Sequence, residues 1–180
     1  LPNPVVFCPW ASVAQNVKFA ARAWPARRGG RARPADLGAA GAPGGLSRRR
    51  ALMEAACEDA LALFELDKIG SERSDGLPAI SAKELGLAMA RAQRPDAYVL
   101  ESPTADLGRA DATRLASLIK SRLGKPILMF TDRYEEIERI CGKFSVVEPG
   151  AGPGAGPIRA ISVDEALSVR PTLREYVDSL

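Results

Sequence analysis

Apolar residues recur at helical spacing in three stretches of the first half of the chain. Residues 12–23, 50–66 and 81–93 each place apolar side chains three or four positions apart. This spacing predicts an amphipathic helix in each stretch. The predicted buried side of the second helix is formed by Leu52, Ala55, Ala56, Leu61, Leu63 and Leu66.

The third of these helices carries its own start and stop signals. Ser81 is its predicted N-cap and Glu84, three residues on, stands at the capping-box position. Pro95 follows shortly after the periodic residues and predicts the end of the helix.

Short unbroken apolar runs replace the helical pattern in the second half. Residues 97–100, 126–130 and 144–148 read as strands, the first two as strands buried on both faces. Helical patterns at 109–123 and 133–141 separate them. Strand and helix in alternation predict a parallel α/β sheet with right-handed crossovers. These patterns divide the chain into three predicted segments. Residues 1–95 form a helical part, residues 96–150 form an α/β core, and residues 151–180 form a linker with two short helices at 163–169 and 171–180.

The positive charge of the chain is confined to one segment. Residues 25–50 hold seven arginines and one acid, so the rest of the chain carries 18 basic and 21 acidic residues. Few large apolar side chains lie in this Gly/Ala/Pro/Arg stretch, which predicts a flexible insertion. Its arginines favour either a solvated loop, as in a high-GC bacterial genome, or contact with an anionic partner.

Composition excludes several kinds of chemistry. The chain has no histidine, so a histidine-based triad, an imidazole general base and a histidine zinc site are all excluded. Cys8, Cys57 and Cys141 are too far apart in sequence for a CxxC pair, and we expect no metal site. The sparse cysteines and the lack of a long apolar run favour a cytoplasmic protein.

A sequence motif follows the first predicted strand. Four apolar residues lead into Glu101-Ser102-Pro103-Thr104-Ala105-Asp106-Leu107-Gly108. This segment resembles the Walker B and D-loop region of ABC-transporter ATPases, with Pro103, Thr104 and Leu107 in agreement. The D-loop positions are then Ala105, Asp106, Leu107 and Gly108.

Three further stretches resemble the same family in the same order. Residues 7–17 resemble the segment after the Q-loop, which puts Asn3 at the position of the Q-loop glutamine, so the predicted helical part (1–95) begins with a Q-loop remnant. Residues 127–136 resemble the H-loop segment, with Asp132 at the histidine position. The signature motif falls on Leu77, Pro78, Ala79, Ile80 and Ser81.

The resemblance implies a P-loop NTPase-like parallel sheet of the ABC ATPase type with a helical subdomain. The family's phosphate-binding GxxxxGK[ST] loop is not in this chain. In the family it precedes the Q-loop, so we expect it, with the N-terminal strands, upstream of Leu1 or missing from the protein.

The departures from the family's motifs fall at the positions that carry its chemistry. Glu101 stands for the magnesium-directed aspartate, Ser102 for the catalytic glutamate and Asp132 for the H-loop histidine. A serine is no base without a partner, and an aspartate repels a γ-phosphate. We therefore expect no hydrolysis. Glu101 and Asp132 are equally well explained as solvated carboxylates or as remnants of a metal contact.

Pro9 and Trp10 lie where the family receives the coupling helix of a transporter. Packing of Trp10 on the helical subdomain is the alternative, and it is the favoured one.

The leading hypothesis is a non-catalytic ABC-ATPase-like protein, without cofactor, that pairs with an ABC permease, a second ABC ATPase or another copy of itself. It would reach the inner membrane only through that partner, and no nucleic acid is expected. A weak ATPase that uses ATP and Mg²⁺ through an upstream Walker A loop is one alternative. An interaction module that binds anionic partners through residues 25–50 is another.

Overall fold

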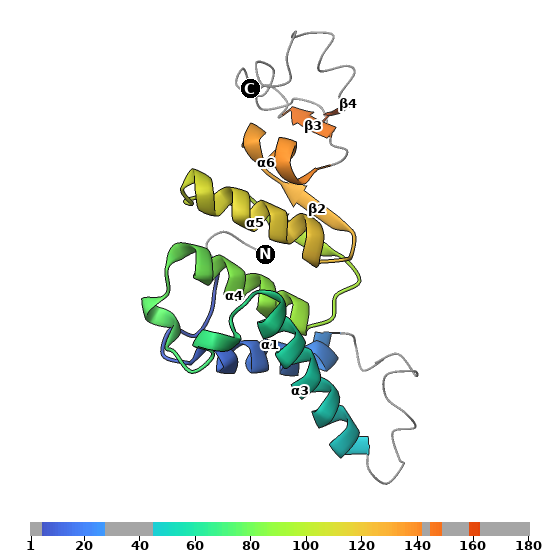
Figure 1. Ribbon diagram of the computed structural model, residues 1–180. Helices are drawn as coiled ribbons and strands as arrows, with labels where there is room; N and C mark the ends of the chain where they lie inside the picture. The colour runs from blue at the N-terminus through green and yellow to red at the C-terminus, as the bar shows by residue number, and fades with distance from the viewer. Residues whose placement is uncertain (1–4, 28–44, 142–144, 149–158, 163–180) are drawn as a thin grey trace, which may run out of the picture. The chain divides into compact units, whose positions relative to one another are not determined.

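The chain divides into two compact units. The first ends at Met129 and the second begins at Phe130. The division predicted from the sequence, after residues 95 and 150, stays a prediction. The computed structural model describes residues 5–27, 45–141, 145–148 and 159–162 (Figure 1).

Three helices form the larger part of the first unit. Helices α1 (Val13–Arg27), α3 (Gly45–Leu63) and α4 (Ala79–Ala92) each pack against the other two. Two short 3₁₀ helices, η1 (Asp67–Ile69) and η2 (Ser74–Gly76), connect α3 to α4. Burial of apolar side chains between the helices stabilises this layer. Its buried residues include Val13, Val17, Ala20, Ala21, Ala56, Cys57, Ala60, Phe64, Leu66, Leu85, Leu87 and Ala88.

Helix α1 begins with a reciprocal cap. The Ser12 hydroxyl accepts the Gln15 N–H at 3.2 Å, and Gln15 Oε1 accepts the Ser12 N–H at 2.9 Å. This capping box satisfies two backbone donors at the start of the helix. The face that includes Val13 and Val17 is then set against the rest of the layer.

The helices on either side of the predicted insertion are longer than expected. Residues 25–27 end α1 and residues 45–50 begin α3, so the predicted insertion over 25–50 is wrong at both ends. Arginine and alanine are good helix formers, and they extend the helices beyond their apolar stripe. Residues 28–44 lie outside the described part of the chain.

Helix α4 begins two residues before the predicted start. Its N-cap is Pro78, with no side-chain cap, so the predicted N-cap Ser81 is wrong and Glu84 forms no capping box. The fixed φ of proline favours helix initiation at this point. The helix ends before Arg94, which adopts a left-handed φ of 47° directly ahead of Pro95.

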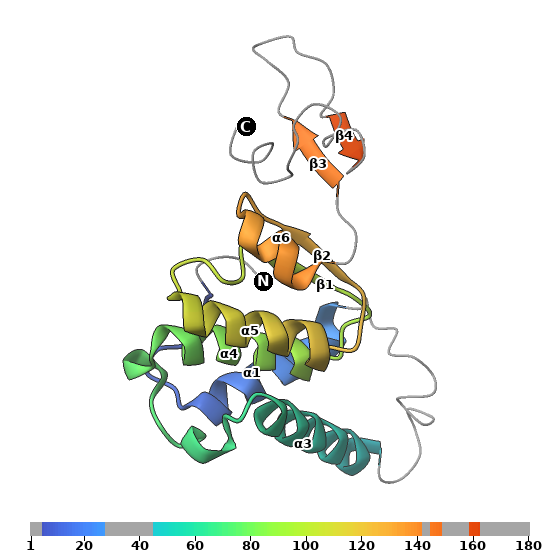
Figure 2. The ribbon, with the colours of Figure 1, turned by 45° about the horizontal axis from the view of Figure 1, so that its top comes forward.

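A β-α-β unit follows the helical layer. Strand β1 (Tyr98–Glu101), helix α5 (Arg109–Arg122) and strand β2 (Ile127–Phe130) agree with the predicted order, and the two strands pair in a small parallel sheet. Gly124, at φ 60°, makes the turn from α5 into β2. Helix α5 lies alongside α4 (Figures 1 and 2).

The predicted burial of β1 and β2 on both faces is wrong. Tyr98 and Leu100 are buried, whereas Val99 is 54% exposed between them. Strand β2 alternates in the same way, with Leu128 and Phe130 exposed. In the described part of the chain, β1 thus has one buried face and one exposed face that carries Val99 and Glu101, and β2 has one half-buried face and one exposed apolar face.

The second unit contains α6 (Tyr134–Ile140) and a hairpin. Strand β3 (Ser145–Glu148) was expected as a third parallel strand, but it pairs antiparallel with β4 (Arg159–Ser162). The register places Glu148 opposite Arg159 and Ser145 opposite Ser162. The predicted helices over 163–169 and 171–180 lie outside the described residues.

Candidate functional site

Trp10 projects from a tight turn ahead of α1. The Ala11 N–H donates to the Cys8 carbonyl at 3.1 Å and closes the turn. Pro9 is exposed and Trp10 is 72% exposed, so the favoured packing of Trp10 on the helical subdomain is wrong. An exposed indole is costly in water and typical of binding surfaces. We call residues 8–11 the tryptophan turn.

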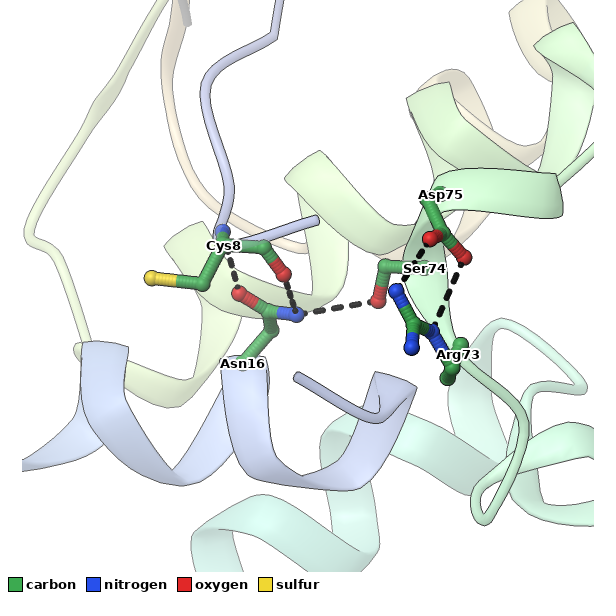
Figure 3. Close-up of polar contacts among 5 residues, drawn as sticks. All are labelled: Cys8, Asn16, Arg73, Ser74 and Asp75. Atoms are coloured by element: carbon green, nitrogen blue, oxygen red, sulfur yellow. Dashed lines mark hydrogen bonds and ion pairs between the residues drawn. The ribbon is translucent and has the colours of Figure 1, made fainter. Parts of the chain in front are cut away.

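The side chain of Asn16 holds this turn in place. Its Oδ1 accepts the Cys8 N–H at 2.8 Å, and its Nδ2 lies 3.0 Å from the Cys8 carbonyl oxygen. The same Nδ2 donates to the Ser74 hydroxyl at 2.9 Å (Figure 3). It also lies 3.2 Å from the Ser12 carbonyl oxygen. Asn16 is 1% exposed, so these bonds are shielded from water. The amide thus joins the turn, helix α1 and η2.

Backbone hydrogen bonds make a second connection between the same segments. The Ser74 N–H donates to the backbone carbonyl of Ala11 at 3.1 Å, and the Val13 N–H donates to the backbone carbonyl of Glu72 at 3.0 Å. Beside them Arg73 and Asp75 form an exposed ion pair, and this contact lowers the pKa of Asp75 (Figure 3). The tryptophan turn is therefore held from two sides, and Trp10 is presented on a rigid base. Sequence reasoning noted Asn16 only as a match to the family and did not single out Ser74, although a polar residue on the apolar face of α1 is a signal for such a buried amide.

The predicted Walker B and D-loop positions lie at the end of β1. Glu101 is exposed, and Ser102 adopts a left-handed φ of 35°. A turn follows, in which the Ala105 N–H donates to the backbone carbonyl of Ser102 at 3.0 Å and the Leu107 N–H donates to the backbone carbonyl of Thr104 at 3.3 Å. Asp106 is exposed with a φ of 66°, and Gly108 is the N-cap of α5.

The predicted signature residues surround the start of α4. Pro78 and Ala79 are exposed, while Leu77, Ile80 and Ser81 are half-buried. An isoleucine side chain here blocks the close backbone approach that a glycine allows.

Asp132 lies in the second unit and is exposed. Next to it the Thr131 hydroxyl accepts the Arg133 N–H at 3.0 Å. Asn3 lies outside the described residues.

Few candidate magnesium ligands lie at the end of β1 in the described part of the chain. Glu101 is a lone exposed carboxylate, followed by a serine. No three acidic, cysteine or histidine side chains gather into a metal-binding group within the part of the chain that the structure describes. A hard divalent cation prefers several oxygen ligands at one point.

An ion pair between the buried Glu84 of α4 and the half-exposed Arg114 of α5 joins the two helices. Glu84 is 2% exposed, and its Oε1 lies 3.0 Å from Nη2 of Arg114, without the alignment of a hydrogen bond. Burial raises the pKa of Glu84, and the guanidinium of Arg114 opposes this rise. The sequence assigned Glu84 to a cap because its spacing from Ser81 matches a capping box, yet its role is to cross-link two helices.

Comparison with known proteins places this fold. The chain is 34% identical over 108 residues to the ribose import ATP-binding protein RbsA 1 of Rhizobium meliloti, covering 54% of this chain and 21% of that protein. It is 30% identical over 185 residues to the taurine import ATP-binding protein TauB of Mesorhizobium japonicum, covering 92% and 62%. The chain thus spans less than two thirds of either relative. No family model matches it.

A solved structure has the same fold. An inward-facing metal-chelate type ABC transporter superimposes with a TM-score of 0.58 over 97% of this chain and 60% of that one, at 15% identity. The parallel β1–β2 pair and the helical layer are thus those of an ABC ATPase, a P-loop NTPase fold. The chain is thus similar in sequence to ABC-transporter ATP-binding proteins and shares the fold of ABC ATPase domains, as the sequence motifs predicted.

Proposed function

We propose that this chain is a non-catalytic ABC-ATPase-like component of an import system that binds a membrane permease through the tryptophan turn. Both relatives described above are import ATP-binding proteins by name. The exposed Trp10 on its clamped turn carries the proposal, because a rigid aromatic side chain loses little entropy on binding. The protein would then lie on the cytoplasmic side of the membrane and be held there by its permease.

The contact is tested by sedimentation with permease-containing membrane vesicles from the source organism. Truncation of a central tryptophan costs at least 2 kcal/mol in a typical interface, so Trp10→Ala should weaken binding about 30-fold. Gln15→Ala, a change at an exposed neighbour, should leave binding nearly unchanged. Equal binding of wild type and Trp10→Ala would overturn the permease contact.

The lack of hydrolysis is proposed from the residues at the ends of β1 and β2. Phosphoryl transfer needs an oriented water and charge stabilisation around the transferring group. Ser102 supplies no base at neutral pH, and Asp132 adds negative charge where the family has a histidine. We infer that no ATP or Mg²⁺ is required as a cofactor.

Incubation of the protein with Mg·ATP tests this part. We expect neither turnover nor a change in melting temperature, since a ligand that binds the folded state raises its stability. Turnover together with a rise of several degrees would favour the alternative, a weak ATPase whose Walker A loop lies upstream of this sequence.

The tryptophan turn also decides among partners. A second ABC ATPase or another copy of the chain would bind in solution, without a membrane. Because we assign Trp10 to the permease contact, Trp10→Ala should not change the sedimentation of the protein, alone or mixed with such an ATPase, when no vesicles are present. An effect there would replace the permease with one of these partners.

A further inference from the structure

A basic groove lies between α1 and α3, away from the tryptophan turn and the β1 end. It has a volume of about 420 Å³, within the range of small-ligand sites. The groove is lined by Lys18, Arg22, Arg50, Met53, Glu54 and Cys57. The first three of these side chains are cations.

Two of the cations have no carboxylate partner among the described residues. Lys18 and Arg22 are exposed and stand four residues apart, so they project from the same face of α1. Arg50, across the groove on α3, is paired with Glu54 at 2.9 Å. Side chains of 81% and 54% exposure form that pair, so a stronger anion can compete for Arg50. The groove therefore has an excess of positive charge.

The inner wall of the groove, formed by Met53 and Cys57, is apolar and lies within the positive electrostatic potential of the cations. Cys57 is 3% exposed, and its burial raises the pKa of the thiol. Lys18 and Arg22 are the largest influences that oppose the rise, so their positive potential reaches the inner wall. Met53 adds a flexible apolar surface beside the thiol. The groove thus offers charged donors at its mouth and an apolar wall behind them.

We propose that this groove binds a phosphate group through Lys18, Arg22 and Arg50, with an apolar part of the ligand against Met53 and Cys57. Guanidinium forks match the geometry of phosphate oxygens, and the lysine adds a mobile point charge. The phosphate belongs either to a free phosphate compound or to an anionic lipid headgroup. The proposal uses only residues of α1 and α3.

Two probes distinguish the two sources. Inorganic phosphate is titrated into the full chain at constant ionic strength, with the melting temperature as the readout. Vesicles of phosphatidylcholine, with and without phosphatidylglycerol, are tested by co-sedimentation. A shift with phosphate indicates a free compound, while binding only to phosphatidylglycerol vesicles indicates a lipid headgroup. Absence of both effects would overturn the proposal.

Matched variants assign the binding to the groove. The double variant Lys18→Gln/Arg22→Gln should weaken binding at least tenfold, because it removes two charge-assisted contacts. Lys68→Gln/Lys125→Gln makes the same charge change at exposed positions outside the groove and should have little effect. Equal weakening by both pairs would show only a general effect of net charge and would refute the site.

A gain of binding gives a test that misfolding cannot imitate. Glu54→Gln removes the one acid of the groove and releases Arg50, so binding should tighten several-fold. Unchanged or weaker binding by this variant contradicts the role of Arg50. Trp10→Ala should leave phosphate binding unchanged, which keeps this result independent of the permease contact.

Discussion

Replacement of Asn16 by alanine tests how the tryptophan turn is held. The amide oxygen accepts one hydrogen bond from the Cys8 N–H, and the two hydrogens of Nδ2 are shared among the Cys8 and Ser12 carbonyls and the Ser74 hydroxyl. Each such bond contributes about 0.5–1.5 kcal/mol net. Cys8 is half-buried, so water can replace part of what is lost. We therefore expect Asn16→Ala to lower the free energy of unfolding by about 2–4 kcal/mol.

Equilibrium urea unfolding, followed by far-UV circular dichroism, measures this loss. Gln15→Ala is the matched control, since Gln15 is exposed and makes one capping bond at 2.9 Å, and it should cost about 0.5–1 kcal/mol. The double variant with Ser74→Ala should show a coupling energy of about 1 kcal/mol between Asn16 and Ser74.

A loss below about 1 kcal/mol for Asn16→Ala would refute this reasoning. The backbone bonds from Ser74 and Val13 would then hold the turn alone. If the reasoning is right, Asn16→Ala should also weaken binding to permease-containing vesicles, because Trp10 loses its rigid base.

Three further predictions concern the core, the backbone and pH. Leu100→Ala should cost about 3 kcal/mol in urea unfolding, against less than 1 for the exposed Val99→Ala. Ser102→Gly should gain about 0.5–1 kcal/mol by relieving a φ of 35°, while Ser102→Ala should gain nothing. Because the pKa of Glu84 is raised above 4.5, the folded state binds its proton more tightly than the unfolded chain. The stabilisation from protonated Glu84 is complete below pH 4.5 and is lost as the pH rises through the raised pKa of the folded state. Over this pH range the wild type should therefore lose free energy of unfolding relative to Glu84→Gln. Parallel stability curves for the two proteins would contradict this.

Local signals predicted the α/β part well. Helix α5 begins and ends within one residue of the prediction, because its apolar period and the stop signals Gly124 and Pro126 act over a few residues. The start of α4 was missed because Ser81 and Glu84 imitate a capping box, while the observed start follows Pro78.

Burial and pairing could not be predicted from local signals. The unbroken apolar run over 97–100 indicates a strand, but whether both faces are covered depends on what packs against it. Strand β3 likewise reads as a third parallel strand, and its true partner β4 follows a Gly/Pro-rich stretch that gives no register. The buried side of α3 shifts toward Cys57 and Ala60 for the same reason, since the neighbouring helices determine which face is covered.

The site was predictable in part. Pro9 and Trp10 were identified through a resemblance, which could not decide between packing and exposure. Asn16 is different, because its partner Ser74 lies 58 residues away in sequence. No local pattern contains that contact.

This sequence separation also sets an order for synthesis. Asn16 leaves the ribosome before its partner, because the hydroxyl of Ser74 follows 58 residues later. At ordinary rates of translation the delay is about 3 to 12 s. During that interval Asn16 has no tertiary partner at Ser74, and Trp10 is tethered only to its own short segment. The tryptophan turn is therefore made before the residues that hold it, and its support becomes complete only when the connection between α3 and α4 has emerged.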